Sequence, residues 1–196
     1  MEKINYYKVL QFVKKKHKGQ VRAGNVPAWF HLARVSNLLE HVLSKTKEGA
    51  KKEREVIFIS ALGHDILEDT NASEYEVGQI FGEEGLKLIK GMTNQFGDRN
   101  VEHYVGGMAR ATEEVRLIKL SDLYDNITSV IYNLHVLGVK WTISYFLPIV
   151  TPMKRVIIKT KFRKFKKTGK YLIDVVVASF DLLQRELKRY QKNKNA

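Results

Sequence analysis

Apolar residues recur every three or four positions along most of the chain. Three segments show the pattern first, with Ile4, Tyr7, Leu10 and Phe12, then Leu32, Val35, Leu38, Leu39 and Val42, then Val56, Ile59 and Leu62. This spacing puts the apolar side chains on one face of an α-helix, where they can pack against a core. Residues 115–120 have a strand-like composition, but the polar residues that follow keep the helical spacing. The sequence therefore predicts an all-α protein, a compact bundle of helices.

Local signals predict several helix boundaries. Ser73 and Glu76 form a capping box, which starts a short helix that ends near residues 81–82. The acidic residues that follow suit the first turn of another helix. Residues 100–111 and 115–137 are predicted to be two further helices.

Size and composition favour a single domain. A chain of 196 residues with 44% hydrophobic residues can bury a substantial core, so residues 1–196 are expected to fold as one unit. The N-terminus does not resemble a secretory signal. The most apolar stretch, residues 141–150, is shorter than the roughly 20 residues that span a bilayer and contains Pro148. These features predict a cytoplasmic protein without a membrane segment, and they leave its oligomeric state open.

The charge distribution favours anionic ligands. The formal net charge is +13, which attracts nucleotides or nucleic acid without distinguishing between them. Between Lys154 and Lys170 there are nine Lys or Arg residues and no acidic one. Such a run is usually a solvated helix face and loop, although it is also suited to be an anion-attracting surface.

The segment ALGHDILEDT, residues 61–70, places one histidine and three carboxylates inside an apolar helical pattern. Buried charges are costly unless they are paired or bound to a metal. On a continuous helix, His64 would lie one turn before Glu68 and Asp65 one turn before Asp69, so the four side chains would share neighbouring faces. This cluster is a candidate site for a cation and a water molecule.

Further ligands must come from distant helices, because two adjacent residues cannot close a metal site. His31 and Asp122, each set among apolar residues, are the candidates. The chain has no cysteine, so the site must use imidazole, carboxylate and water. Such ligands suit Mn, Fe, Co, Ni or Zn, and oxygen-rich sites favour Mn or Mg.

These residues resemble the HD phosphohydrolase superfamily, whose metal ligands follow the order H…HD…D. HDILEDT at 64–70 is similar to HD-x-x-EDT of its RelA/SpoT-type alarmone hydrolase branch, and KLSDLYDN at 119–126 resembles KLAD-x-x-x-N. HKGQVRAGNVPAWFH at 17–31 looks like H-x-GQ-x-R…G-x-P-x-x-x-H, and FGEEGLKLIKGMT at 81–93 also resembles that branch. The likeness covers roughly residues 6–135, and the basic helical extension at 138–196 has no counterpart.

The resemblance implies a set of site residues. Four would bind a divalent cation, usually manganese: His31, His64, Asp65 and Asp122. Glu68 and Asp69 would position or activate the attacking water. Four more would contact the nucleotide, with Arg22 near the guanine base: Arg22, Tyr104, Asn126 and Ser129. Asn126 and Ser129 follow Asp122 by four and seven residues, so the three would share one helical stripe.

The implied activity is that of a stand-alone alarmone hydrolase of the stringent response, which releases pyrophosphate from the 3′ position of guanosine 3′,5′-bispyrophosphate, (p)ppGpp. Departures from the family pattern concern the substrate side: Leu32 replaces a proline, Ala23 a basic residue and Asp125 a histidine. Two alternatives remain. One is an HD phosphohydrolase acting on another nucleotide or a phosphomonoester, and the other is a basic nucleic-acid-binding or regulatory module with a vestigial site.

Neighbouring aromatic and histidine residues are given structural roles only. Trp29 and Phe30 are expected to lie in the core beside His31. The remaining histidines are expected to be surface or capping groups: His17, His41, His103 and His135.

Overall fold

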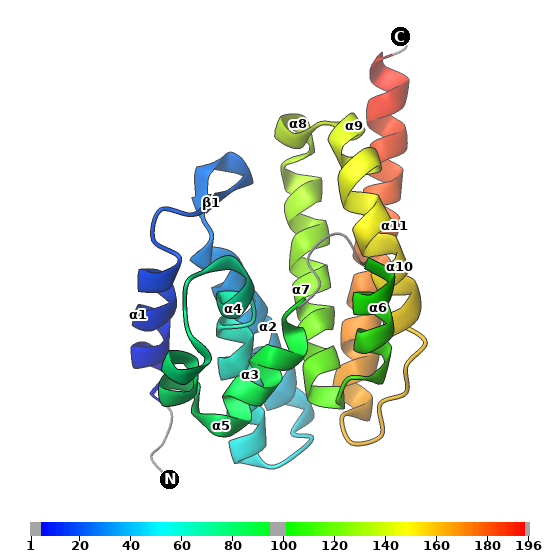
Figure 1. Ribbon diagram of the computed structural model, residues 1–196. Coiled ribbons are helices and arrows are strands. Elements are labelled where there is room, and N and C mark those ends of the chain that lie inside the picture. The colour runs from blue at the N-terminus through cyan, green and yellow to red at the C-terminus, as the bar shows by residue number, and fades with distance from the viewer. Residues whose placement is uncertain (1–4, 95–100, 195–196) are drawn as a thin grey trace.

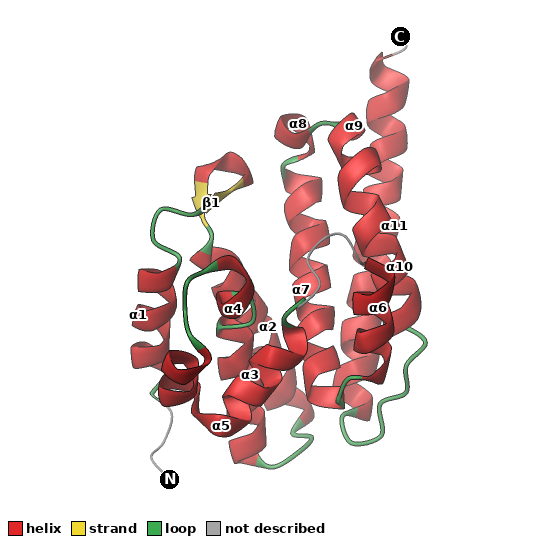
Figure 2. Ribbon diagram, viewed as in Figure 1, coloured by secondary structure: helices red, strands yellow, loops and turns green. Residues whose placement is uncertain are grey.

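The computed structural model describes residues 5–94 and 101–194, and nearly all of them are helical (Figures 1 and 2). The helices of the N-terminal half are α1 (Tyr6–Lys16), α2 (Trp29–Thr46), α3 (Lys51–Leu62), α4 (Ile66–Asp69) and α5 (Glu74–Met92). Those of the C-terminal half are α6 (Val101–Arg110), α7 (Glu113–Tyr132), α8 (Leu134–Leu137), α9 (Val139–Trp141), α10 (Leu147–Ile157) and α11 (Lys166–Lys194). The prediction of an all-α fold is confirmed.

A short β-hairpin joins α1 to α2. Strands β1 (Val21–Arg22) and β2 (Val26–Pro27) are antiparallel and are connected by a 3₁₀ turn, Ala23–Asn25. The turn contains Gly24 with a φ of 76° and Asn25 with a φ of 56°, a backbone conformation that these two residue types adopt more readily than others. The hairpin is the one sheet in the described residues, and the hydrophobic pattern gave no sign of it.

Helix α7 runs through the middle of the bundle. It contacts α2, α3 and α5 on one side and α6, α10 and α11 on the other (Figure 1). Its N-terminus is capped by the Thr112 side chain, which accepts a hydrogen bond from the Val115 N–H. Because neighbours surround α7, polar as well as apolar side chains of this helix are buried, and Asp122 and Asp125 are among them.

Two hydrophobic clusters form the core. The larger joins α7 and α11 to α2, α3 and α10, and the smaller lies between α1, α3 and α5. Leu172, Val176 and Leu183 of α11 are fully buried in the larger cluster. The C-terminal extension is therefore helical, as predicted, and its buried face belongs to the same apolar cluster as α7.

Several helix boundaries agree with the sequence signals. The Ser73 hydroxyl accepts the Glu76 N–H, and the Glu76 carboxylate accepts the Ser73 N–H, so the capping box is present. Within α5, Gly82 has φ 74° and ψ 171°, which breaks the helix where an end was predicted. The helix predicted at 115–137 is interrupted at Asn133, which caps α7 and precedes α8. Residue 100, predicted to begin the preceding helix, lies outside the described residues.

Acidic side chains anchor the basic segment 154–170 to the bundle. The Glu113 carboxylate accepts hydrogen bonds from the backbone N–H groups of residues 163–165. The Glu48 carboxylate likewise accepts those of residues 167–168, at the start of α11. Carboxylates can supply the acceptors that a helix start needs. No helix within the described ranges has the length and apolar character needed to cross a membrane.

Candidate metal centre

The ligand candidates come from three helical regions that meet beside α7. His31 lies in the first turn of α2 and Asp122 in the middle of α7. His64 and Asp65 lie in a turn between α3 and α4. The prediction of a continuous helical turn through residues 61–70 was therefore wrong. Helix α3 ends at Leu62, and the chain turns before α4 begins at Ile66.

Gly63 allows the turn that carries His64 and Asp65. A Cβ atom at Gly63 would lie 2.4 Å from Cζ of Phe81, which is buried in the smaller hydrophobic cluster. Only a residue without a side chain lets the end of α3 approach this ring so closely. On the other side of the turn, the fully buried Ile66 anchors α4 in the same cluster. Packing on both sides thus sets the direction of the two ligand side chains.

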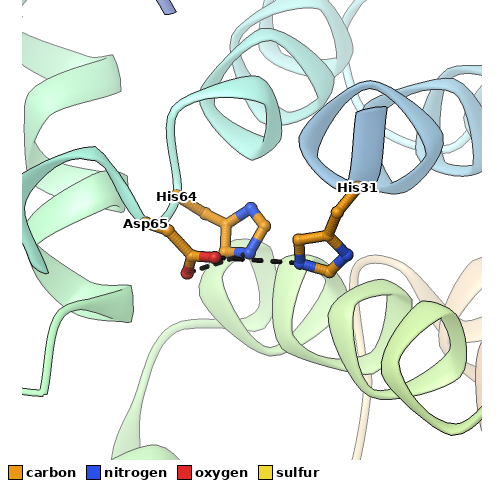
Figure 3. A group of neighbouring side chains, drawn as sticks. All are labelled: His31, His64 and Asp65. Carbon is orange, nitrogen blue, oxygen red and sulfur yellow. Dashed lines mark ion pairs between the residues drawn. The ribbon is translucent and has the colours of Figure 1, made fainter. Parts of the chain in front are cut away.

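The side chains of His31, His64 and Asp65 converge on one point (Figure 3). One potential ligand atom from each lies within 4.8 Å of the others. The His64 Nε2 atom is 3.0 Å from Asp65 Oδ1, and the His31 Nε2 atom is 3.7 Å from Asp65 Oδ2. Asp122 completes the group, since its Oδ1 atom lies 3.2 Å from His31 Nε2 and 3.5 Å from His64 Nε2. We call these four residues the His–Asp cluster.

The two histidines present equivalent nitrogen atoms to the cluster. His64 Nδ1 donates to the Ala61 carbonyl oxygen at 2.7 Å, and His31 Nδ1 lies 2.7 Å from Asp125 Oδ2. Both Nε2 atoms are buried and, among the described residues, have no hydrogen-bond partner in good geometry. Buried polar atoms without partners are rare in native proteins. Two imidazole lone pairs facing two carboxylates fit a divalent cation, so the donor set is suited to a metal.

The electrostatics of the His–Asp cluster are those of an ion-binding site. Burial opposes the protonation of His64, but the charges of Asp65 and Asp122 outweigh it and raise the pKa of His64 to about 10. Burial also opposes ionisation of Asp65, yet His64 lowers its pKa to about 2. The pKa of Asp122 is lowered well below its usual range, mainly by Lys119 against the effect of burial. The carboxylates therefore stay ionised and attract positive charge, which a bound cation would supply in place of a proton.

Asp122 is fixed by two further side chains of α7. Lys119 Nζ lies 2.8 Å from Asp122 Oδ2, and Asn126 Nδ2 donates to Asp122 Oδ1 at 2.6 Å. Asn126 Oδ1 in turn accepts a hydrogen bond from Arg22 of the β-hairpin. Burial lowers the pKa of Lys119, but the charge of Asp122 more than compensates and raises it, so Lys119 stays protonated. The structure thus links two predicted substrate residues, Arg22 and Asn126, to the predicted ligand Asp122.

Glu68 and Asp69 lie on α4 at the rim of the site, where both keep contact with solvent. The Glu68 carboxylate accepts the Asn94 N–H at 3.0 Å. Partial burial, together with the charge of Asp65, raises the pKa of both carboxyl groups. The Asp69 carbonyl accepts a hydrogen bond from Gln20 Nε2 at 2.6 Å, which ties α4 to the segment before the hairpin.

A cavity of about 770 Å³ opens beside the His–Asp cluster and is lined by Asp122. All four residues predicted to contact a nucleotide line this cavity: Arg22, Tyr104, Asn126 and Ser129. Its far wall is aromatic, with Tyr132 of α7, Trp141 of α9, and Tyr145 and Phe146 of the π-helical segment Thr142–Phe146. Charged groups near the ligands and an aromatic wall further away suit a ligand with an anionic and a planar part.

No family model matches the chain. A curated relative from Drosophila melanogaster, named guanosine-3′,5′-bis(diphosphate) 3′-pyrophosphohydrolase MESH1, is 29% identical over 130 residues, which are 62% of this chain and 67% of the relative. A protein named for the same activity in Aquifex aeolicus is 32% identical over 123 residues, 60% of this chain and 16% of that protein. A solved structure, described as a metazoan orthologue of SpoT that hydrolyses ppGpp, has a TM-score of 0.72 at 21% identity, covering 95% of this chain and 98% of the other.

Three curated relatives, from Drosophila, Aquifex and Borreliella, carry the same activity name. The chain is similar to these three relatives over 60% to 67% of its length, and to the solved structure in its fold. It spans 16% and 20% of the Aquifex and Borreliella relatives, so the likeness concerns one part of those longer proteins. The structural likeness concerns the fold. Because it covers 95% of the chain, it includes most of residues 138–196, for which the motifs gave no counterpart.

The structure adds three charged residues to those expected from sequence. Lys119, Arg34 and Asp125 all line the cavity beside Asp122. Lys119 precedes Asp122 by three residues and Asp125 follows it by three, so helical spacing was a signal that placed both on the same face. Arg34 lies on α2, and nothing in its sequence context indicated a contact with α7.

One structural expectation, the core position of Phe30, needs correction. Phe30 is 41% exposed and stacks on the half-buried Trp29, so it is not a core residue. His17 is a capping group, as one of its two predicted roles had it, since it caps the C-terminus of α1, and it is buried there. Its Nδ1 atom lies 2.7 Å from Gln20 Oε1, so it helps to hold the segment that leads into the hairpin.

Proposed function

We propose that this protein is a metal-dependent 3′-pyrophosphohydrolase of (p)ppGpp that acts in the cytoplasm and releases pyrophosphate from guanosine 3′,5′-bispyrophosphate. The observation that carries the proposal is the position of the His–Asp cluster. Its two unpartnered Nε2 atoms lie next to a cavity that is lined by every residue expected to contact the nucleotide. The names of the curated relatives give the substrate.

The His–Asp cluster would hold the cation, for which we propose manganese because the site combines imidazole with oxygen ligands. When bound, such a cation lowers the pKa of a water molecule and withdraws charge from a phosphate oxygen. Asn126 and Lys119 keep the Asp122 carboxylate in place for this purpose. His31 and His64 are held by the hydrogen bonds of their Nδ1 atoms.

Glu68 and Asp69 would act on the attacking water. The raised pKa of the Glu68 carboxyl makes it a stronger base than an ordinary glutamate, so it can accept the proton of the water, and Asp69 can orient it. Arg22 would contact the guanine base. The positive charge of Arg22 lines the cavity, which favours a polyphosphate chain and stabilises charge on the leaving pyrophosphate. Tyr104 and Ser129 would complete the nucleotide contacts.

The test is release of pyrophosphate from guanosine tetraphosphate by the purified full chain with added Mn²⁺. Glu68→Gln should lower kcat by about 100-fold or more, because a general base contributes about 10²- to 10⁴-fold. The matched control is Glu83→Gln, a substitution at an exposed position of α5. Equal rates for Glu68→Gln and the wild type would contradict the role of Glu68 as the general base. If folded, manganese-loaded protein shows no turnover, the proposed substrate is wrong, and other nucleotides and phosphomonoesters should be tested as substrates.

A further inference from the structure

Asp125 is a buried carboxylate that lies behind the His–Asp cluster. It is 6% exposed and occupies the position on α7 one turn after Asp122. Its Oδ2 atom is 2.7 Å from His31 Nδ1, on the side of the imidazole ring that faces away from the cluster. Helix α7 thus contributes one candidate ligand and also the side chain that contacts another.

Arg34 balances the charge of Asp125. Its Nε atom donates to Asp125 Oδ1 at 2.6 Å, and its Nη2 atom donates to Asp125 Oδ2 at 2.9 Å. This two-point pairing fixes the plane of the carboxylate as well as its position. It also offsets a negative charge that would otherwise add to those of Asp65 and Asp122 in a buried site.

The two histidines differ in what holds their outer nitrogen. His64 Nδ1 donates to a neutral backbone carbonyl, that of Ala61, whereas His31 Nδ1 faces the anionic carboxylate of Asp125. A carboxylate acceptor keeps the proton on Nδ1, leaves the Nε2 lone pair directed at the cluster, and makes the imidazole a stronger electron donor. His31 therefore has the support expected of the more strongly bound of the two imidazole ligands.

We infer that Asp125, held by Arg34, is a positioning residue that fixes the tautomer and orientation of His31 for metal binding. The inference rests on the proposed metal site. It concerns a position at which this chain departs from the motif it resembles, where the family has a histidine. The structure explains this departure, because Asp125 is paired with Arg34 of α2 and with the imidazole of His31.

The experiment measures Mn²⁺ affinity of the full chain by calorimetry in the absence of substrate. Asp125→Ala should weaken binding by about 10- to 100-fold, the usual effect of losing an outer-shell partner of a ligating histidine. Asp125→Asn should weaken it less, because the amide oxygen can still accept the Nδ1 proton. Asp181→Asn, at an exposed position of α11, is the matched control and should bind Mn²⁺ as the wild type does.

A second measurement separates positioning from general damage to the fold. For Asp125→Asn, the Mn²⁺ concentration needed for half of the variant's own maximal rate should rise above that of the wild type, while its thermal unfolding without metal should show a folded protein. A folded Asp125→Asn protein with wild-type Mn²⁺ affinity would overturn the inference and leave the proposed function standing. A wild-type protein that binds no divalent cation would overturn the metal site itself, and the inference with it.

Discussion

Asp122 is the residue on which most polar contacts of the candidate site meet. One of its oxygen atoms faces both histidines and Asn126, and the other is bonded to Lys119. This division leaves one oxygen for the cluster and uses the other to fix the carboxylate. The side chain of Lys119 is 14% exposed, so its ammonium group depends on Asp122 for compensation of its charge.

Lys119→Met should therefore destabilise the protein. Removing one partner of a buried ion pair leaves the other charge uncompensated and costs about 3 kcal/mol or more. The free energy of unfolding in urea, measured without metal, is expected to fall by that order. Lys87→Met, at an exposed position of α5, should leave stability nearly unchanged. Equal stability of the two variants would show that Asp122 does not rely on Lys119.

At the scale of the elements, the turn between α3 and α4 decides where the ligands point. If the helix continued through residue 63, the side chains of His64 and Asp65 would point in directions about 100° apart around its axis. The turn instead brings both adjacent side chains to the same cluster, which neighbouring residues of one helix cannot easily do. The contact between Gly63 and Phe81 is what makes the turn possible.

Gly63→Ala should disturb this turn and destabilise the fold. Its Cβ would overlap the Phe81 ring, and forcing an extra carbon into a packed core costs about 1–3 kcal/mol. Thermal unfolding checks the result. The matched control is Gly107→Ala in α6, where a Cβ would meet nothing within 4 Å. There the gain in helix propensity, up to about 1 kcal/mol, should leave stability unchanged or higher. A Gly63→Ala protein as stable as this control would contradict the role given to Gly63.

At the scale of the whole molecule, two carboxylates join the helices around α7 to the basic C-terminal part of the chain. Glu48 follows α2 and Glu113 begins α7, and both accept backbone N–H groups around the start of α11. Partial burial raises the pKa of each carboxyl group, but these hydrogen bonds outweigh it and lower both below the usual 4.5. They therefore stabilise the folded protein when they are ionised.

The sign of the resulting pH dependence follows from the lowered pKa values. The contribution of Glu48 and Glu113 is fully present above the ordinary glutamate pKa of 4.5 and is lost as the pH falls through their lower folded-state values. Both residues are only half-buried, so solvent screens these interactions and we expect about 1 kcal/mol from each. The wild type should exceed a Glu48→Gln, Glu113→Gln double variant in unfolding free energy at about pH 6, and the difference should shrink by about pH 3. A difference that does not change with pH would contradict this origin.

The sequence by itself determined the helical class of the fold, because the spacing of apolar residues depends only on the geometry of a helix. It also placed caps and breaks such as Ser73 and Gly82, since these depend on neighbouring residues alone. The ligand candidates His31, His64 and Asp122 were identifiable because polar residues inside an apolar pattern need a reason to be buried. The structure brings them together, and their metal-binding roles remain a prediction.

Only the tertiary structure decided which distant residues meet. The turn after Leu62 packs against the Phe81 ring of another helix, a contact that the local sequence does not reveal, so the local sequence predicted continuity instead. The contact of Asp125 with His31 and Arg34 joins residues about ninety positions apart, and most of the aromatic wall of the cavity comes from residues 141–146, which lie in no recognised motif. Contacts of this kind depend on how the helices pack, and periodicity along the chain carries no information about which faces become neighbours.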